Sequence, residues 1–367
     1  MVAVAGALRV MLLTRHLPLR EALARITTER VLDRLRLLDE ALRRWGFESP
    51  RLALAGLNPH AGVRLFAKLE YMNPGGSIKD RAALFMIEDG ERSGALTPGK
   101  IVIEATSGNT GIGLALVCAV KGYRLRLAMS ESASVERQMI LRARGAEILL
   151  TPGHLGTDGA IEEVYRLARE DPDQYFMTDQ FNNPANYRAH QDGTAREIWQ
   201  QTGGEVTHVV TTLGTTGTAM GLSMGLKPLN PAVQIIGIEP FMGHKLQGLK
   251  NMKESYCPEI FDKARLDRKM NVDDEEAFEM TRRLARTEGL LVGMSSGAAV
   301  AAALRVAATI DRGTLVVILP DGGERYLSTP LFAVKEKADV RLFDTMQRRA
   351  RRLDTIQPGK VRMYSCG

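Results

Sequence analysis

The chain has 367 residues, of which 44% are hydrophobic and 25% are charged, enough apolar sequence for two modest cores. Its 49 basic and 43 acidic residues give a net charge of +6, which is too small and too mixed to indicate a nucleic-acid-binding surface. The apolar start, residues 1–13, is shorter than the roughly 20 residues that span a bilayer, and the three cysteines lack metal-ligand spacing. We therefore expect a cytoplasmic protein that has neither a membrane segment nor a bound metal.

Strands and helices alternate along most of the chain. This alternation predicts an α/β fold with parallel sheets between helices, and ligands at the carboxyl ends of the strands. The predicted strands are 101–105, 124–129, 148–151, 207–212, 233–239 and 315–319. The predicted helices are 31–45, 79–93, 112–120, 133–144, 158–169, 219–226, 273–287 and 296–309.

One lysine stands at a predicted helix start. Gly75 and Gly76 form a turn before Lys79, and Ser77 followed by Asp80 has the spacing of a capping box. The helix macrodipole opposes a protonated ammonium in the first turn. Lys79 is therefore biased toward the neutral amine that a Schiff base requires.

Two loops join a predicted strand to a predicted helix. Residues 106–111 (Thr-Ser-Gly-Asn-Thr-Gly) follow the first strand, and residues 214–218 (Gly-Thr-Thr-Gly-Thr) follow a later one. Free backbone N–H groups at a helix N-terminus bind anions. The hydroxyls of the second loop suit a phosphate, so the sequence predicts a site with an amine, a carboxylate cradle and a phosphate cradle.

Several motifs stand along the chain in the same order as in a known enzyme family. The motifs are Lys68-Leu69-Glu70, the loops at 106–111 and 214–218, Asp179 to Asn186, Gly293 to Gly297, and Gly323 to Thr329. Together they resemble the cysteine synthase family of pyridoxal-phosphate enzymes. The resemblance covers residues 63–332 and implies fold type II, in which the cofactor lies between two three-layer α/β/α subdomains.

The resemblance also implies residue roles. Lys79 would hold pyridoxal 5'-phosphate as an internal aldimine and remove the substrate Cα proton, and Ser295 would face the pyridine nitrogen. A neutral hydroxyl there leaves a weaker electron sink than an aspartate, which favours prompt loss of a β-leaving group to give an aminoacrylate. The cofactor phosphate and ring hydroxyl would contact Gly214, Thr215, Thr216, Gly217, Thr218 and Asn109. The substrate carboxylate would contact Thr106, Ser107, Gly108, Thr110 and Gln180.

Substrate and partners follow from the same family. The chain is most similar to the B-type branch, which implies cysteine synthesis from O-acetylserine or O-phosphoserine and sulfide or another sulfur donor. Lys250 could place a cation near the leaving group and so admit O-phosphoserine. A homodimer is implied, with serine acetyltransferase or a sulfur-carrier protein as possible partners. Cystathionine β-synthase-like and serine dehydratase-like activities are alternatives.

The two ends depart from the family pattern. Residues 1–62 form an atypical extension that resembles an internal piece of 4-hydroxythreonine-4-phosphate dehydrogenase, through residues 13–20 and 56–62. Residues 333–367 form a basic tail whose end resembles the start of a cysteinyl-tRNA synthetase. Because the family's usual N-terminal segment is replaced, a catalytically impaired fusion or interaction fragment remains a second hypothesis.

Overall fold

The computed structural model describes residues 2–5, 8–11, 62–106, 108–131, 135–253 and 257–332. The chain divides into two compact units, residues 1–57 and 58–367. In the first unit, β1 (Val2–Ala5) pairs antiparallel with β2 (Leu8–Met11). The predicted helix 31–45 and the tail from residue 333 lie outside the described residues.

The second unit contains a four-stranded parallel sheet in the order β6-β5-β4-β7. The apolar residues of β4 point alternately to the two faces of the sheet, because successive side chains in a strand point to opposite faces. Val102 packs in a core with α3, α4 and α5, whereas Ile101 and Ile103 pack against α6. The strands are β4 (Ile101–Ala105), β5 (Arg124–Ser130), β6 (Glu147–Thr151) and β7 (Tyr175–Met177). The helices are α3 (Lys79–Ser93), α4 (Asn109–Lys121), α5 (Val135–Ala143) and α6 (Gly156–Glu170).

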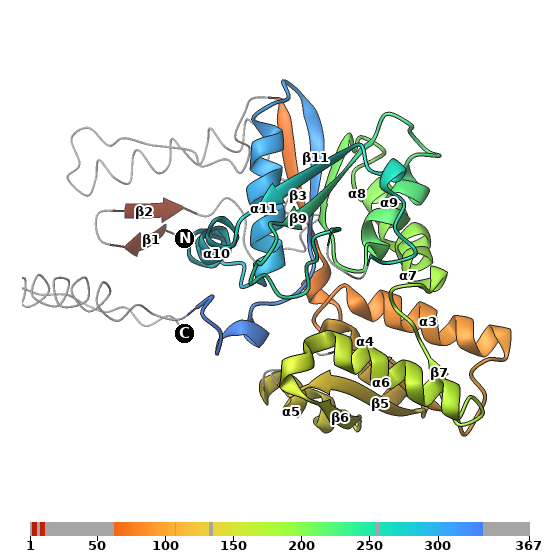
Figure 1. Cartoon of the computed structure of the whole chain (residues 1–367). Coiled ribbons are helices and arrows are strands. Elements are labelled where there is room, and N and C mark those ends of the chain that lie inside the picture. Colours follow the sequence, from red (N-terminus) through yellow and green to blue (C-terminus); the bar gives the residue numbers. More distant parts are fainter. Residues whose placement is uncertain are drawn as a thin grey trace, which may run out of the picture. The chain divides into compact units, whose positions relative to one another are not determined.

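A five-stranded parallel sheet in the order β10-β9-β8-β11-β3 forms the other half of this unit (Figure 1). Leu315 and Val317 of β11 pack on the side of α10 and α11, and Val316 and Ile318 pack on the side of α8 and α9. The strands are β3 (Val63–Leu69), β8 (His208–Thr212), β9 (Gln234–Pro240), β10 (Arg268–Val272) and β11 (Gly313–Leu319). The helices are α7 (Pro184–Ala189), α8 (Ala195–Gln201), α9 (Gly217–Leu226), α10 (Asp274–Arg283) and α11 (Met294–Ala307).

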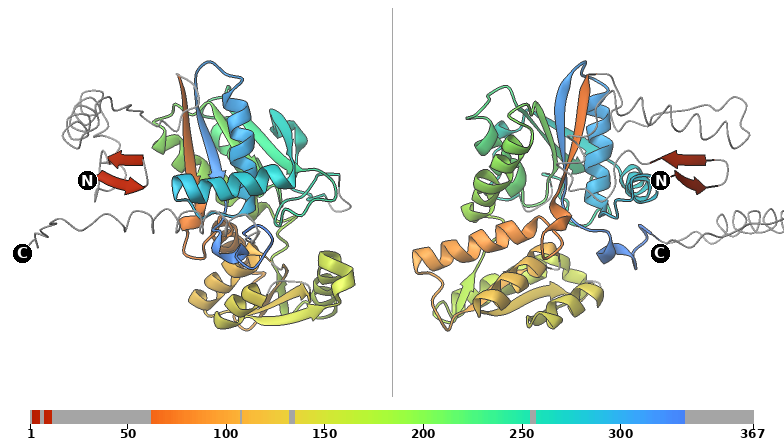
Figure 2. Two further views of the ribbon diagram at one scale, coloured as in Figure 1. Left: turned by 90° about the vertical axis from the view of Figure 1, so that its left-hand side faces the viewer. Right: turned by 180° about the vertical axis from the view of Figure 1, so that it is seen from behind.

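Both sheets are covered by helices on both faces, as predicted for two α/β/α layers. The views in Figure 2 place α11 and the α7–α9 group on opposite sides of the five-stranded sheet. Short 3-10 segments occur at Glu70–Met72, Gly153–Leu155, Lys263–Arg265 and Glu324–Tyr326. π-Helical turns, η3 (His190–Thr194) and η5 (Leu284–Glu288), lie between α7 and α8 and after α10.

The six predicted strands are all present, but β1, β2, β3, β7 and β10 are not among the strands that the sequence predicted. β7 has only three residues, too few to show a period, and β10 is a polar edge strand whose only buried residue is Val272. Edge strands carry a weaker hydrophobic signal because one side lacks a neighbouring strand. The helix predicted at 273–287 is α10 followed by the turn η5.

The predicted capping box at the start of α3 is wrong. α3 begins at Lys79 and ends at Gly94, whose φ of 74° is left-handed, as the sequence indicated. The Ser77 hydroxyl accepts a hydrogen bond from the Lys79 backbone N–H at 3.3 Å, and not from that of Asp80 as a capping box requires. The Asp80 carboxylate instead accepts a hydrogen bond from the backbone N–H of Gly75. Asp80 therefore closes the glycine turn that leads into the helix, a partner that local sequence spacing cannot identify.

Candidate active site

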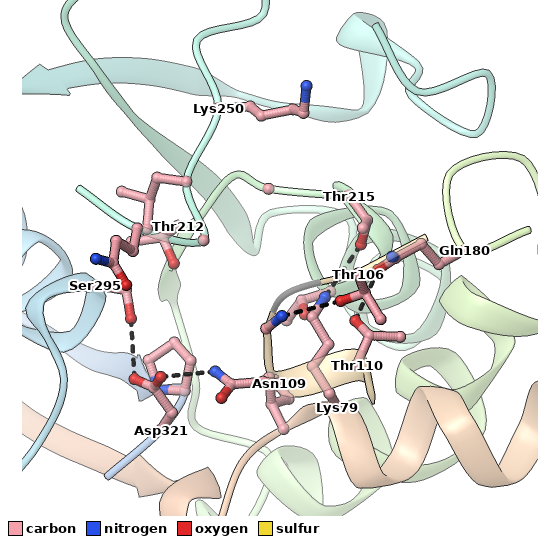
Figure 3. A pocket seen from close by; sticks show the side chains of 18 of the residues that line it. Lys79, Thr106, Asn109, Thr110, Gln180, Thr212, Thr215, Lys250, Ser295 and Asp321 are labelled. Atoms are coloured by element: carbon pink, nitrogen blue, oxygen red, sulfur yellow. Dashed lines mark hydrogen bonds between the residues drawn. The ribbon is translucent and has the colours of Figure 1, made fainter. Parts of the chain in front are cut away.

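A cavity of about 470 Å³ lies where the carboxyl ends of β4, β8 and β11 meet the start of α3 (Figure 3). Residues from both sheets line it. The carboxyl ends of parallel strands are where ligands bind in open α/β sheets. Of the predicted site residues, twelve line the cavity: Lys79, Thr106, Gly108, Asn109, Thr110, Gln180, Gly214, Thr215, Thr216, Thr218, Lys250 and Ser295. Gly217 is the first residue of α9, just behind the lining, and Ser107 lies outside the described residues.

Lys79 extends into this cavity, and its Nζ donates a hydrogen bond to Thr215 Oγ1 at 3.2 Å. Burial lowers the pKa of Lys79 from 10.5 to about 8, against the negative charge of Asp321, which raises it. At pH 7 about one Lys79 side chain in ten is then uncharged, several hundred times the fraction of an ordinary lysine. The sequence analysis attributed the neutral amine to the helix macrodipole. The structure shows desolvation as the main cause of its lowered pKa.

The loop between β8 and α9 has the features of a phosphate site. Thr216 has a left-handed φ of 67° and caps α9 without a side-chain hydrogen bond, so the first N–H groups of the helix are free of a side-chain cap. The buried Thr216 hydroxyl has no hydrogen-bond partner among the described residues. A Cβ on Gly214 would lie 2.4 Å from the Gly248 carbonyl oxygen, so only glycine fits there. Uncapped N–H groups and an unsatisfied hydroxyl fit a phosphate.

The loop between β4 and α4 is tied to Gln180. The Thr110 hydroxyl donates to Gln180 Oε1 at 2.7 Å, and Gln180 Nε2 donates to the Ala105 carbonyl at 3.3 Å. Behind them, the buried Glu104 carboxylate accepts from the Thr178 hydroxyl at 2.5 Å and from the Gln180 backbone N–H at 3.1 Å. Burial raises the pKa of Glu104 to about 7. A buried polar network therefore holds the two segments predicted to bind the substrate carboxylate.

Asp321 is a residue of the cavity that sequence reasoning missed. Its Oδ2 accepts from Asn109 Nδ2 at 2.6 Å, and its Oδ1 accepts a longer hydrogen bond, 3.4 Å, from the Ser295 hydroxyl. Asp321 follows β11 by two residues. The rule that found the other loops, ligand groups after a parallel strand, would have found it as well.

Lys250 lies across the cavity from Asp321 (Figure 3). Its backbone N–H donates to the Leu213 carbonyl at 2.9 Å, which ties its segment to the end of β8. Its Nζ stands 5.6 Å from the centre of the Phe181 ring, within the range of a cation–π contact. The predicted cation therefore borders the cavity.

Membrane-spanning helices and metal-binding clusters are both absent from the described part of the molecule. It contains no helix that is both long and apolar enough to cross a membrane. Nor does it hold a group of three or more histidine, cysteine, aspartate and glutamate side chains placed to bind a metal.

Two family models match the chain. The model described as "Pyridoxal-phosphate dependent enzyme" matches residues 43–321, and the model described as "Pyridoxal phosphate biosynthetic protein PdxA" matches residues 1–67. The N-terminal segment thus resembles a different protein from the rest of the chain, as predicted. Neither match extends into residues 333–367, so neither supports their resemblance to a cysteinyl-tRNA synthetase.

Known proteins resemble most of the chain. A cysteine synthase of Aquifex aeolicus is 47% identical over 279 residues, 75% of this chain and 85% of that protein. A cysteine synthase B of Pseudomonas aeruginosa is 45% identical and covers 77% of this chain and 94% of its own length. The crystal structure of a cysteine synthase from Entamoeba histolytica, 40% identical, superposes with a TM-score of 0.71 over 79% of this chain and 94% of that one. The chain therefore belongs to the cysteine synthase family of pyridoxal-phosphate dependent enzymes.

Proposed function

We propose that this enzyme makes L-cysteine by β-replacement on an O-activated serine, with Lys79 as the residue that binds pyridoxal phosphate covalently. The observation that carries the proposal is the Lys79 amine, which burial keeps partly uncharged in a cavity bordered by the two loops that lead into α4 and α9. An amine with a lowered pKa is the form of lysine that reacts with an aldehyde.

The bound cofactor withdraws electrons from the substrate Cα and so eases loss of its proton. The chain's own groups supply positioning and proton transfer. Lys79 would accept that proton at Nζ. The phosphate would sit at the start of α9 against Thr215, Thr216 and Thr218, and Asn109 and Ser295 would contact the ring.

Substrate orientation falls to the segments around Gln180. Thr106, Ser107, Gly108, Thr110 and Gln180 would bind the substrate carboxylate at the start of α4, where the helix N-terminus favours an anion. Closure of this loop over the substrate would keep water from the reactive site. We expect substitutions here to raise KM for the serine derivative.

We propose that Lys250 admits O-phosphoserine as well as O-acetylserine. A departing phosphate carries more negative charge than acetate, so a cation at the rim stabilises its departure more. Lys250→Ala should therefore lower kcat/KM for O-phosphoserine more than for O-acetylserine. Lys245→Ala is the matched control, because Lys245 is exposed on the same segment and does not line the cavity. Equal losses with both substrates would remove Lys250 from the leaving-group site.

The test of the main proposal combines a chemical label with product analysis. Borohydride reduction of the enzyme, followed by peptide mass spectrometry, should place the cofactor on Lys79, and Lys79→Ala should lose both the label and cysteine formation. A label on another lysine, or cysteine formation by Lys79→Ala at the wild-type rate, would refute the assignment. Cystathionine made from homocysteine, or pyruvate made without a thiol, would favour the alternative activities. No product from any substrate would favour an impaired fusion fragment.

We further propose that the chain acts as a homodimer in the cytoplasm. Serine acetyltransferase and a sulfur-carrier protein are the partners to test. Analytical ultracentrifugation measures the oligomeric state. Co-elution of purified components tests each partner in turn.

A further inference from the structure

Asp321 is the only carboxylate among the described residues that line the cavity. It is 1% exposed, yet it accepts three hydrogen bonds: from Asn109 Nδ2 at 2.6 Å, from the Tyr326 hydroxyl at 2.5 Å and from the Ser295 hydroxyl at 3.4 Å. Burial of a carboxylate is costly unless donors and charge compensate for it. This site therefore holds a buried, hydrogen-bonded carboxylate in the same cavity as the Lys79 amine.

The carboxylate determines how two neighbouring side chains can bond. An ionised carboxylate only accepts hydrogen bonds, so both Asn109 and Ser295 must donate to it. The guanidinium of Arg325 donates to Asn109 Oδ1 at 2.5 Å and so holds the opposite end of the same amide. A flipped amide would turn its NH2 group to the guanidinium and its oxygen to the carboxylate. Asn109 is thus held in one orientation, which leaves one amide hydrogen for a ligand.

These contacts also cross from one sheet to the other. Asn109 begins α4 next to the four-stranded sheet, and Asp321 follows β11 of the five-stranded sheet. A hydrogen bond between them therefore connects the two halves of the unit at the cavity. Figure 3 shows the Asn109 amide and the Ser295 hydroxyl converging on the Asp321 carboxylate.

Lys79 experiences this charge from across the cavity. The described charged and titratable groups near Lys79 and Asp321 are Asp80 and Arg81 of α3, His190 of η3, Lys250 in the cavity lining, and Arg325 and Tyr326 after β11. Burial, together with the charges of Lys79 and Arg81, lowers the pKa of His190 to about 3, so this ring is neutral. Arg81 is occupied by Glu70 and Glu197. Asp80 accepts a hydrogen bond from the Gly75 backbone N–H, whereas the charge of Asp321 raises the pKa of Lys79, so Asp321 acts as the counter-charge of the amine.

We propose that Asp321 is a positioning residue of this site: it fixes the donors of Asn109 and Ser295 and supplies the counter-charge of Lys79. The inference rests on the proposed function, in which Lys79 captures the cofactor. Because Asp321 favours the ammonium, its removal should increase the uncharged fraction of Lys79. Because Asp321 also orients Asn109, the same change should weaken binding of the captured cofactor. A residue with only a structural role would not shift the pH profile.

The experiment follows cofactor capture by cofactor-free enzyme across pH, with borohydride trapping and absorbance as readouts. Asp321→Asn should move the midpoint of the pH–rate profile down by at least about half a unit, which makes capture about threefold faster at pH 7. The dissociation constant of pyridoxal phosphate should increase by about threefold or more. Glu239→Gln is the control, because Glu239 is also buried, near the carboxyl end of the parallel strand β9, but does not line the cavity, and it should keep the wild-type midpoint.

Asp321→Glu completes the set, because it keeps the charge but displaces the hydrogen-bond partners. It should retain the midpoint and lose affinity, and it serves as the test variant if Asp321→Asn fails to fold. A wild-type midpoint in Asp321→Asn, or a shifted midpoint in Asp321→Glu, would overturn the inference alone. Cofactor that borohydride traps covalently in Lys79→Ala would instead overturn the proposed function.

Discussion

Gly217 offers a sharp test of how the phosphate loop is held. A Cβ added at Gly217 would lie 2.2 Å from Asn186 Oδ1 and 2.6 Å from its Cγ, so Gly217→Ala must displace the buried Asn186 side chain. Asn186 Nδ2 donates to the Gln180 carbonyl at 2.7 Å and to Thr215 Oγ1 at 3.1 Å. Losing both bonds should cost about 1–3 kcal/mol of unfolding free energy, partly offset by up to ~1 kcal/mol from the helix preference of alanine.

Urea unfolding of the cofactor-free enzyme measures that cost, and absorbance titration measures pyridoxal phosphate affinity. Because Asn186 holds Thr215 at the phosphate loop, affinity should fall about tenfold, equivalent to ~1.4 kcal/mol. Gly153→Ala is the control, since a Cβ there meets nothing within 4 Å, and it should change stability by less than about 0.5 kcal/mol.

A double-mutant cycle separates the clash from other effects. In an Asn186→Ala background the obstacle is gone, so Gly217→Ala should be close to neutral in stability and in cofactor affinity. Additive losses in the double variant, or wild-type affinity in Gly217→Ala, would refute the role of Asn186.

Three further changes test other parts of the site. Ser295→Asp should slow cysteine formation about tenfold, which corresponds to ~1.4 kcal/mol of activation barrier, because a second carboxylate beside Asp321 alters the charge at the cofactor ring. An unchanged rate at full cofactor content would mean that Ser295 does not face the ring nitrogen. The pKa of Glu104, raised from 4.5 to about 7, lets the folded protein bind an extra proton between these values, so stability falls as pH rises through that window, by roughly 3 kcal/mol. Glu104→Gln should flatten this part of a urea-unfolding profile measured between pH 5 and 8, and an unchanged slope would contradict the assignment. Removal of residues 341–367 should leave cysteine formation within about threefold, because every residue assigned to the site precedes residue 330. Loss of cysteine formation in a folded, cofactor-loaded variant would show that the tail has a role in catalysis.

Local patterns in the amino-acid sequence determined most of the site. A glycine-rich turn before a helix predicted a site at Lys79, and two loops between an apolar strand and a helix were predicted to bind anions. The structure brings these segments to one cavity, because a parallel strand brings the residues after it to one edge of its sheet, whatever the rest of the chain does. The alternation of strands and helices along the chain likewise predicted parallel sheets between helices.

Tertiary structure decided what local spacing cannot express. Asp80 bonds to Gly75, Asp321 meets Asn109 from the other sheet, and the weak strands β7 and β10 exist only because neighbours pair with them. The reactivity of Lys79 is also a tertiary property, since burial lowers its pKa and a carboxylate 242 residues later in the chain opposes that shift. Desolvation and charge depend on which groups surround a side chain in space, and these groups come from segments far apart in the sequence.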